Sequence, residues 1–115
     1  MDPARLSLSA ALRAMKSGNL TAVELLDACL ERINVREPEV LAWVTMDREA
    51  AREKAAAMDA VGRPGSLGGI PVGLKDIIDT SDFGTEYNSI IYKGYRPPVD
   101  AAVVSILKNA GSNIL

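Results

Sequence analysis

The chain has 115 residues, of which 48% are hydrophobic, and a formal net charge of −2. This length allows one small domain, and the hydrophobic content is that of a globular protein and not of a disordered one. The slightly acidic balance, with basic residues scattered among acidic ones, argues against a nucleic-acid-binding surface on this segment.

The N-terminal half of the sequence predicts three helices. Apolar residues recur at helical spacing over about 7–17 and about 21–36, and an alanine-rich stretch follows over about 47–61. Pro38 is expected to end the second helix, because a proline in a helix interior removes a hydrogen bond and clashes with the preceding turn. A short apolar run over about 40–45 is interpreted as a buried strand.

The second helix begins with a complete set of start signals. Thr21 and Glu24 have the spacing of a capping box, in which each side chain accepts a hydrogen bond from the backbone N–H of the other residue. Leu20 and Leu25 occupy the two positions of a hydrophobic staple. The buried stripe of this helix is expected to comprise Val23, Leu26, Leu30 and Ile33.

The C-terminal half has a different character. Four segments are expected in chain order: a glycine-rich loop (62–69), a strand (about 70–75), an irregular stretch (80–98) and a helix (about 100–110). Asp100 is expected to cap this last helix, with Val103, Leu107 and Ala110 on its buried face. Residues 113–115 indicate the beginning of another strand, so the chain is expected to stop inside a structural unit.

The residue of most chemical interest in the expected strand is Lys75. Alternation along a strand places it on the same face as Pro71 and Gly73, whose side chains are small, which leaves open space beside the ammonium. One interpretation is therefore a cleft with a lysine on its wall. The other is an ordinary lysine at the end of a strand, with its ammonium in water or paired with Asp76 or Asp79, and the spacing alone favours this second interpretation.

Two further chemistries match the sequence only in part. Gly68 and Gly73 have the separation found in a P-loop, but the residues after Gly73 lack the required serine or threonine, and the glycines precede the strand instead of following it. Cys29 is the only cysteine, so an internal disulfide and a cysteine zinc site are excluded. Histidine is absent, so no histidine can act as a base to activate the Cys29 thiol. We expect Cys29 to be a small buried hydrophobic residue.

Residues 69–80, with the sequence GIPVGLKDIIDT, resemble the lysine motif of the amidase-signature family, G-I-P-V-x-x-K-D-x-x-D. Segments 20–25, 95–101 and 103–115 resemble other parts of the same family in the same order. The resemblance implies an α/β fold with a mixed central sheet flanked by helices. Residues 1–115 would form its N-terminal segment, and the C-terminal remainder would be absent.

The resemblance also implies an enzyme that hydrolyses amide C–N bonds with a Ser–cis-Ser–Lys triad. Lys75 matches the lysine of that triad and is the one catalytic residue that the resemblance assigns. The serines of this chain, Ser81, Ser89, Ser105 and Ser112 among them, do not lie in the glycine/serine-rich loop of the family, which is expected beyond Leu115. The isolated chain is therefore expected to be inactive. A small-molecule amide is the implied substrate, and no metal or organic cofactor is implied.

A lysine that acts as a base has to lose its proton, and a carboxylate bonded to it would oppose that loss. Asp76 alternates to the strand face opposite Lys75, so we expect it to fix neighbouring backbone and not to pair with the lysine. Asn88–Ser89 stands where the family often has Gly-Ser, and Asn88 is a residue type that adopts positive φ.

Three functions stay open at this point. The first is an amidase. The second is part of the tRNA-dependent amidotransferase subunit that supplies ammonia to a misacylated tRNA, the only alternative that involves nucleic acid. The third is a non-catalytic interaction module that retains the fold and is monomeric and cooperative by itself. To complete the fold we expect the remainder of the same polypeptide or a homo-oligomer partner. The sequence shows no signal peptide or membrane span, so a cytoplasmic location is expected.

Overall fold

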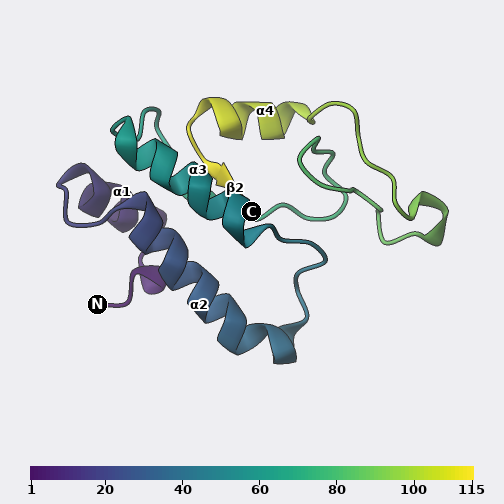
Figure 1. Ribbon diagram of the computed structural model, residues 1–115, viewed down its shortest axis with the longest axis horizontal. Coiled ribbons are helices and arrows are strands. Elements are labelled where there is room, and N and C mark those ends of the chain that lie inside the picture. The colour runs from purple at the N-terminus through teal and green to yellow at the C-terminus, as the bar shows by residue number, and fades with distance from the viewer.

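The computed structural model describes residues 1–115 and measures 47 × 32 × 22 Å along its principal axes. Helices of the N-terminal half lie together on one side, and a long loop extends from them on the other side (Figure 1). The helices are α1 (Leu8–Lys16), α2 (Ala22–Val40), α3 (Arg48–Ala60) and α4 (Ala102–Asn109), with single 3₁₀ turns at Pro3–Arg5 and Ile90–Tyr92. None of the helices is both long and apolar enough to cross a membrane.

The first three helices begin at side-chain caps, as expected. Ser7, Thr21 and Asp47 each accept a hydrogen bond from the backbone N–H three residues later. The capping box of α2 is confirmed, because Glu24 N donates to Thr21 Oγ1 at 3.1 Å and Thr21 N donates to Glu24 Oε2 at 2.8 Å. Both staple residues before and within α2 are buried. These local contacts satisfy N–H groups that a helix start otherwise leaves without a partner.

The hydrophobic core lies between α1, α2 and α3. Its largest fully buried side chain is Leu26 of α2, and Ala51 and Ala55 of α3 are buried against it and its neighbours. Alanine side chains let two helices approach closely but bury little apolar area per residue. The core is consequently thin, as the alanine-rich composition indicates.

The expected end of α2 near residue 36 is wrong. The helix continues through Pro38 to Val40, and Leu41 ends it in the left-handed conformation with φ of 51°. Because Pro38 lies in the last turn, its missing N–H removes only one intrahelical hydrogen bond. The N–H of Leu41 still closes the turn by donating to Glu37 O at 2.9 Å.

The buried strand expected over about 40–45 is also wrong. This segment is the end of α2 followed by an irregular loop, and Val44 is 72% exposed. Trp43 is half-buried, and its backbone N–H donates to Glu37 Oε1 at 2.7 Å. A short apolar run has no periodicity that separates a strand from a helix end.

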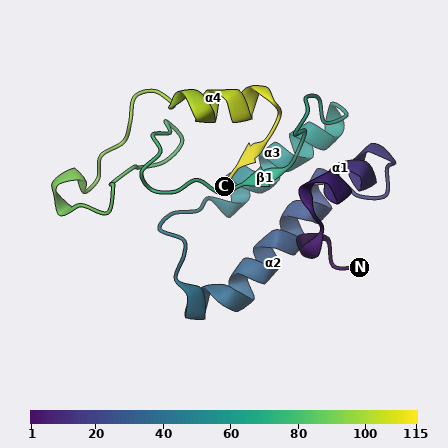
Figure 2. The same cartoon turned by 180° about the vertical axis from the view of Figure 1, so that it is seen from behind.

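The strand expected over about 70–75 is present only in part. Its paired residues form β1 (Pro71–Val72), which lies parallel to β2 (Asn113–Ile114). Both strands lie beside α3 (Figure 1 and Figure 2), and Asn113 Nδ2 donates to Ala51 O of that helix at 2.8 Å. Since β2 pairs with only these two residues, the chain from Gly73 to Lys75 is irregular.

The last helix differs from expectation in its cap and in its buried face. α4 begins after Ala101, which makes no side-chain cap hydrogen bond, and the Asp100 carboxylate binds elsewhere. Val104 is fully buried, whereas Val103, expected to face inward, is 49% exposed. Leu107 and Ala110 are half-buried, so the expected buried face is wrong only at Val103, whose neighbour Val104 is buried in its place.

The glycine-rich loop packs against the turn after α4. A Cβ on Gly65 would lie 2.3 Å from Ala110 O, and a Cβ on Gly111 would lie 2.3 Å from Pro64 O. The backbone N–H groups of Leu67 and Gly69 donate to the carbonyls of residues 110 and 111, both at 2.8 Å. These glycines therefore serve close backbone packing.

Candidate functional site

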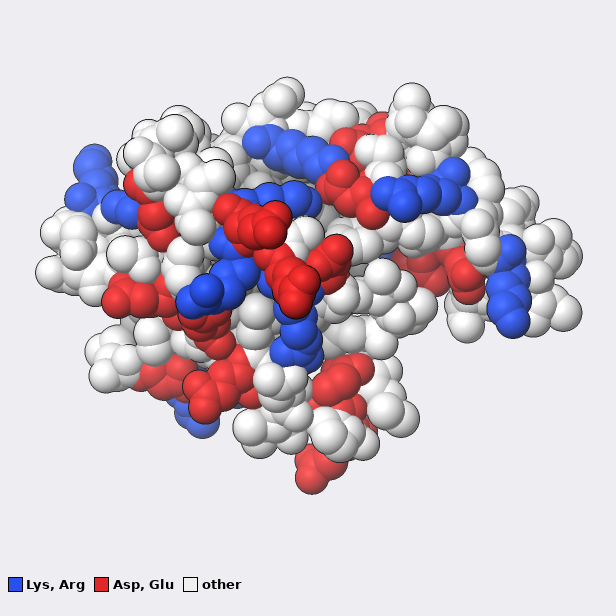
Figure 3. Space-filling model, viewed as in Figure 1, with Lys and Arg blue, Asp and Glu red and all other residues white.

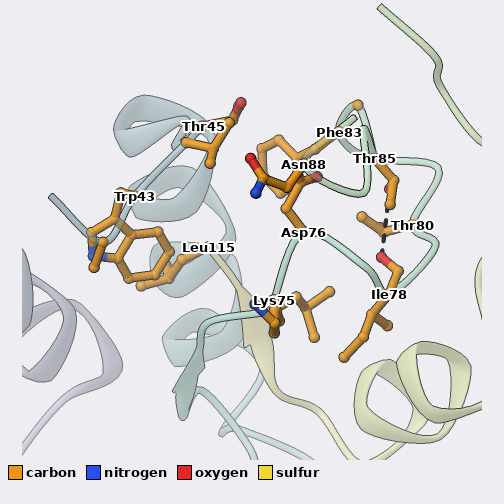
Figure 4. Close-up of a pocket in the computed structure, with 14 residues that line it drawn as sticks. Trp43, Thr45, Lys75, Asp76, Ile78, Thr80, Phe83, Thr85, Asn88 and Leu115 are labelled. Carbon is orange, nitrogen blue, oxygen red and sulfur yellow. Dashed lines mark hydrogen bonds between the residues drawn. The ribbon is translucent and has the colours of Figure 1, made fainter. Parts of the chain in front are cut away.

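A pocket of about 260 Å³ lies beside Lys75. Trp43 and Leu115 form one side of it, and Asp76, Phe83 and Asn88 lie on the other side (Figure 4). The pocket thus joins the loop after α2, the chain after β1 and the loop that follows it. Apolar and polar side chains both line the space.

Lys75 itself is exposed at this pocket and forms no ion pair with any carboxylate of the chain. Its backbone is fixed by a turn, in which Ile78 N donates to Lys75 O at 3.0 Å. The alternation inferred from the sequence persists in outline, since Ile70 is buried while Gly73 and Lys75 are exposed. This exposure agrees with an ammonium in water, one of the two forms of the interpretation that the spacing alone favours, whereas the other form, pairing with Asp76 or Asp79, is absent.

The space expected beside Gly73 is occupied by Trp43. A Cβ on Gly73 would lie 2.8 Å from Cη2 of the indole, so any side chain here would displace the ring. Glu37 holds the Trp43 backbone through the hydrogen bond described above. Sequence reasoning missed this wall of the pocket because it assigned Trp43 to a buried strand.

Asp76 fixes neighbouring backbone, as expected. Its Oδ1 accepts a hydrogen bond from Glu86 N at 3.0 Å, and its backbone carbonyl accepts one from Tyr87 N at 3.0 Å. The loop after Lys75 therefore returns to the residue directly following the lysine. The Asp76 carboxylate is engaged there and not with the ammonium.

Asp79 is engaged by the same loop. The Tyr87 hydroxyl donates to Asp79 Oδ1, and Ala101 N donates to the Asp79 carbonyl at 2.8 Å. The hydrogen bond to this carboxylate raises the pKa of Tyr87 to about 12. The Tyr87 ring also contacts the rings of Tyr92 and Tyr95, with centroids 5.0 and 6.4 Å away.

Tyr87 and Asn88 both have left-handed backbone, with φ of 54° and 53°. Positive φ at Asn88 is in line with the sequence, because asparagine tolerates it. Positive φ at Tyr87 could not be expected from the sequence, because tyrosine is not a residue type that favours it. For a bulky side chain this conformation is uncommon and costly. The contacts of Tyr87 with Asp76 and Asp79 hold it in this conformation.

A second polar cluster anchors the loop to α4. Asp100 Oδ1 accepts from Ser81 N at 2.8 Å and from Ser81 Oγ at 3.0 Å, and Lys108 Nζ donates to Asp100 Oδ2 at 2.8 Å. Lys108 also pairs with Asp82 at 2.9 Å. The Lys108 ammonium and the Ser81 donors hold the pKa of the Asp100 carboxyl well below its usual range. Ser81 is thereby occupied in a structural role.

The remaining candidate groups carry no additional chemistry. Cys29 is half-buried, and burial raises the pKa of its thiol, which disfavours the thiolate needed for nucleophilic attack. No cluster of three or more histidine, cysteine, aspartate or glutamate side chains is arranged to hold a metal ion. Acidic and basic side chains are interleaved on the face shown in Figure 3, in keeping with the scattered charges of the sequence.

Comparison with known proteins places the motif in a family. The Amidase family model matches residues 24–115. This chain belongs to the amidase family. The resemblance of residues 69–80 to the amidase-signature lysine motif is therefore confirmed.

Relatives and solved structures agree on the fold. The glutamyl-tRNA(Gln) amidotransferase of Chloroflexus aggregans has a subunit that is 44% identical over 114 residues, which cover 96% of this chain and 23% of the relative. The native peptide amidase of Stenotrophomonas maltophilia has a TM-score of 0.86 at 32% identity, covering 97% of this chain and 24% of that one. A fatty acid amide hydrolase has a TM-score of 0.90 at 20% identity, which supports the fold alone.

The N-terminal part of the amidase-signature α/β fold, expected from the sequence, is therefore present, and the chain spans about a quarter of the length of the proteins that it matches.

Proposed function

We propose that this chain carries the lysine of an amide C–N hydrolase and that Lys75 is the base. In the reaction of the amidase-signature type, the lysine amine accepts a proton from a bridging serine, which deprotonates the nucleophilic serine. The serine oxygen attacks the amide carbon, the C–N bond breaks and the amine leaves with a proton. Water then releases the acyl group from the serine as a carboxylic acid. The observation that supports this role is the unpaired Lys75 side chain at a pocket whose neighbouring carboxylates, Asp76 and Asp79, bind elsewhere.

The two serines of that reaction have no match in this chain. We therefore propose that the remainder of an amidase-length polypeptide, or a partner copy, completes the site, and that the 115-residue chain alone does not hydrolyse amides. The proposed substrate is a small-molecule amide, and the proposed location is the cytoplasm.

A hybrid enzyme tests the role of Lys75. Residues 1–115 would replace the matching N-terminal segment of the Stenotrophomonas maltophilia peptide amidase, and hydrolysis of a peptide amide would be measured. We expect Lys75→Met to lower kcat by about 10²- to 10⁴-fold, the range in which general bases contribute. Lys93→Met is the matched control, because Lys93 is also exposed and unpaired. Equal activity of the two variants would exclude Lys75 as the base.

A second candidate function is that of the ammonia-supplying subunit in a tRNA-dependent amidotransferase, of which this chain would be a part. It is favoured by identity, since the Chloroflexus aggregans amidotransferase subunit is 44% identical and the peptide amidase 32%. The lysine chemistry would be the same, and the released ammonia would be passed on to a misacylated tRNA.

A second hybrid separates the two candidates. The same 115 residues would replace the matching segment of the Chloroflexus aggregans amidotransferase, and amidation of glutamyl-tRNA(Gln) would be measured together with hydrolysis by the peptide amidase hybrid. Activity of the amidotransferase hybrid alone supports the amidotransferase role. Activity of the peptide amidase hybrid alone supports the amidase role.

A further inference from the structure

We propose that Tyr87 is a positioning residue for Lys75: Tyr87 closes the loop after the lysine and keeps the Asp79 carboxylate away from the lysine ammonium. This inference rests on the proposed role of Lys75 as a base. It assigns a task to a tyrosine outside the lysine motif, on a segment that the sequence predicts to be irregular.

The loop after Lys75 is closed by two backbone amides, those of Glu86 and Tyr87. Tyr87 N donates to the Asp76 carbonyl at 3.0 Å, and the preceding residue, Glu86, donates its N–H to Asp76 Oδ1 at 3.0 Å. Two consecutive amides thus bind the residue next to Lys75. With the turn from Lys75 O to Ile78 N, these contacts fix the backbone on the C-terminal side of the lysine.

The Asp79 carboxylate is the second acidic group of the lysine motif. The hydrogen bond from Ile78 N to Lys75 O closes a turn over residues 75–78, and Asp79 is the residue that directly follows this turn. A carboxylate bonded to an ammonium stabilises the charged form, which is the wrong form for a base. Here the Asp79 carboxylate instead accepts a hydrogen bond at Oδ1 from the Tyr87 hydroxyl. The Asp76 carboxylate accepts a hydrogen bond from Glu86 N. Both carboxylates of the motif are therefore hydrogen-bonded to the same two-residue segment, Glu86–Tyr87.

The backbone of Tyr87 has an uncommon left-handed conformation. A tyrosine with φ of 54° persists only where surrounding contacts impose it. Here the backbone N–H, the hydroxyl and the ring all have partners: Asp76, Asp79 and the rings of Tyr92 and Tyr95. The strained residue is followed by Asn88, which lies at the Lys75 pocket. The strain is therefore located where the loop meets the candidate site.

The test uses the 115-residue chain and requires no hydrolysis. Reductive methylation with formaldehyde and a borane reductant acts on the neutral amine, and mass spectrometry reports its rate separately at Lys75 and at Lys93. We expect Tyr87→Phe to slow the methylation of Lys75 about two- to fivefold, the range that an exposed ion pair supplies, and to leave Lys93 unchanged. The double variant Tyr87→Phe/Asp79→Asn should restore the Lys75 rate, because the released side chain then carries no charge.

Two further measurements separate positioning from general destabilisation. Tyr92→Phe is the matched control, since Tyr92 belongs to the same ring cluster and its hydroxyl forms no hydrogen bond in the structure. It should leave the Lys75 rate unchanged. Hydrogen exchange of the backbone amides at positions 86 and 87 should accelerate in Tyr87→Phe and not in Tyr92→Phe. Should Tyr87→Phe fail to fold by circular dichroism, Asp79→Asn alone is used: it keeps an oxygen acceptor for the hydroxyl and should lower the pKa of Tyr87 in an ultraviolet titration.

The proposal is overturned if Lys75 is methylated in Tyr87→Phe at the native rate, or if the double variant fails to restore that rate. It is also overturned if Asp79→Asn leaves the titration of Tyr87 unchanged. These results are independent of the hybrid enzymes. If Lys75→Met retains activity in the hybrid, the proposed function fails, while the contact between Tyr87 and Asp79 is judged by the methylation and exchange rates.

Discussion

Residues 8–60 and residues 73–101 are held in place by different kinds of contact. In the first region, α1, α2 and α3 pack their apolar side chains into one core. The second region has only a single 3₁₀ turn, and its path is set by side-chain carboxylates that accept hydrogen bonds from backbone N–H groups. The Lys75 pocket lies between them, with Trp43 on one side and the loop of the second region on the other.

This difference determines what each region contributes. Burial of apolar area is non-directional, so the helices supply stability without fixing the position of any single polar atom. Hydrogen bonds to carboxylates are directional and charge-assisted, so the loop contacts set the positions of atoms around Lys75. We therefore expect substitutions in the helices to change the free energy of unfolding most, and substitutions in the loop to change pH dependence and local geometry.

The largest effect is expected in the core. Leu26→Ala removes a side chain with no exposed area from the contact between α2 and its neighbours. The free energy of unfolding, measured by urea denaturation, should fall by about 2–5 kcal/mol, because a cavity adds to the lost transfer energy. Val35→Ala is the control on the same helix, since Val35 is largely exposed. Equal losses for the two variants would mean that the helices do not share a packed core.

The next effect is expected where the glycine-rich loop meets the turn after α4. Gly111→Ala introduces a Cβ 2.3 Å from Pro64 O at a φ of +88°, so the backbone has to move. Gly18→Ala imposes the same kind of left-handed strain, at a φ of +77°, but has nothing within 4 Å. Gly18→Ala should cost about 1 kcal/mol and Gly111→Ala clearly more, measured by thermal unfolding. Similar costs would show that close packing does not join the two parts.

A smaller and pH-dependent effect is expected in the loop region. The pKa of Asp100 is depressed in the folded chain, so its stabilising contribution is present above the unfolded pKa of about 3.9 and is lost as the pH falls towards the folded value. At pH 7, Asp100→Asn should lower the free energy of unfolding by about 1 kcal/mol. The difference from the native chain should shrink below about pH 4.

Asp27→Asn is the control for that measurement. Asp27 forms a surface pair with Arg52, in which both side chains are substantially exposed, so its loss should change stability little at any pH. A loss at Asp100 that is independent of pH would contradict the assignment of the charged carboxylate as the acceptor for Ser81 and Lys108.

The same division explains what could be predicted from the sequence. The capping box of α2 was predictable because its two residues are three positions apart. The contacts of Asp59 with Ala22 N and of Asp100 with Ser81 N were not, because they join residues 37 and 19 positions apart. Local patterns carry no information about such partners, and the assignment of Asp100 as a helix cap was wrong for this reason.

The candidate site was predictable to a similar extent. Lys75 was identified from a motif of adjacent residues, and the backbone-fixing role of Asp76 followed from strand alternation. The wall formed by Trp43 was missed, because the short apolar run around it predicts a strand once Pro38 is expected to end α2 earlier. The contact between Tyr87 and Asp79 was missed because positive φ at a tyrosine has no sequence signature.

An effect of similar size is expected at the start of α2, where it tests whether the two regions are as distinct as their contacts suggest. Thr21→Ala removes the cap for Glu24 N and should cost about 1 kcal/mol, while Thr21→Ser keeps the hydroxyl and should cost less. The same helix start is also bound by a distant carboxylate, since Ala22 N and Val23 N donate to Asp59 at 2.9 and 3.1 Å.

Partial burial opposes the ionisation of Asp59, but the hydrogen bonds from Ala22 N and Val23 N and from Arg63 hold the pKa of Asp59 below its ordinary value. We expect Asp59→Asn to cost at least as much as Thr21→Ala in urea denaturation at pH 7, and its cost to decline as the pH falls below about 4. If Thr21→Ala costs more, local capping dominates and the helices are independent of distant charges. If Asp59→Asn costs more, the helical region depends on the same carboxylate-to-backbone contacts that shape the loop beside Lys75.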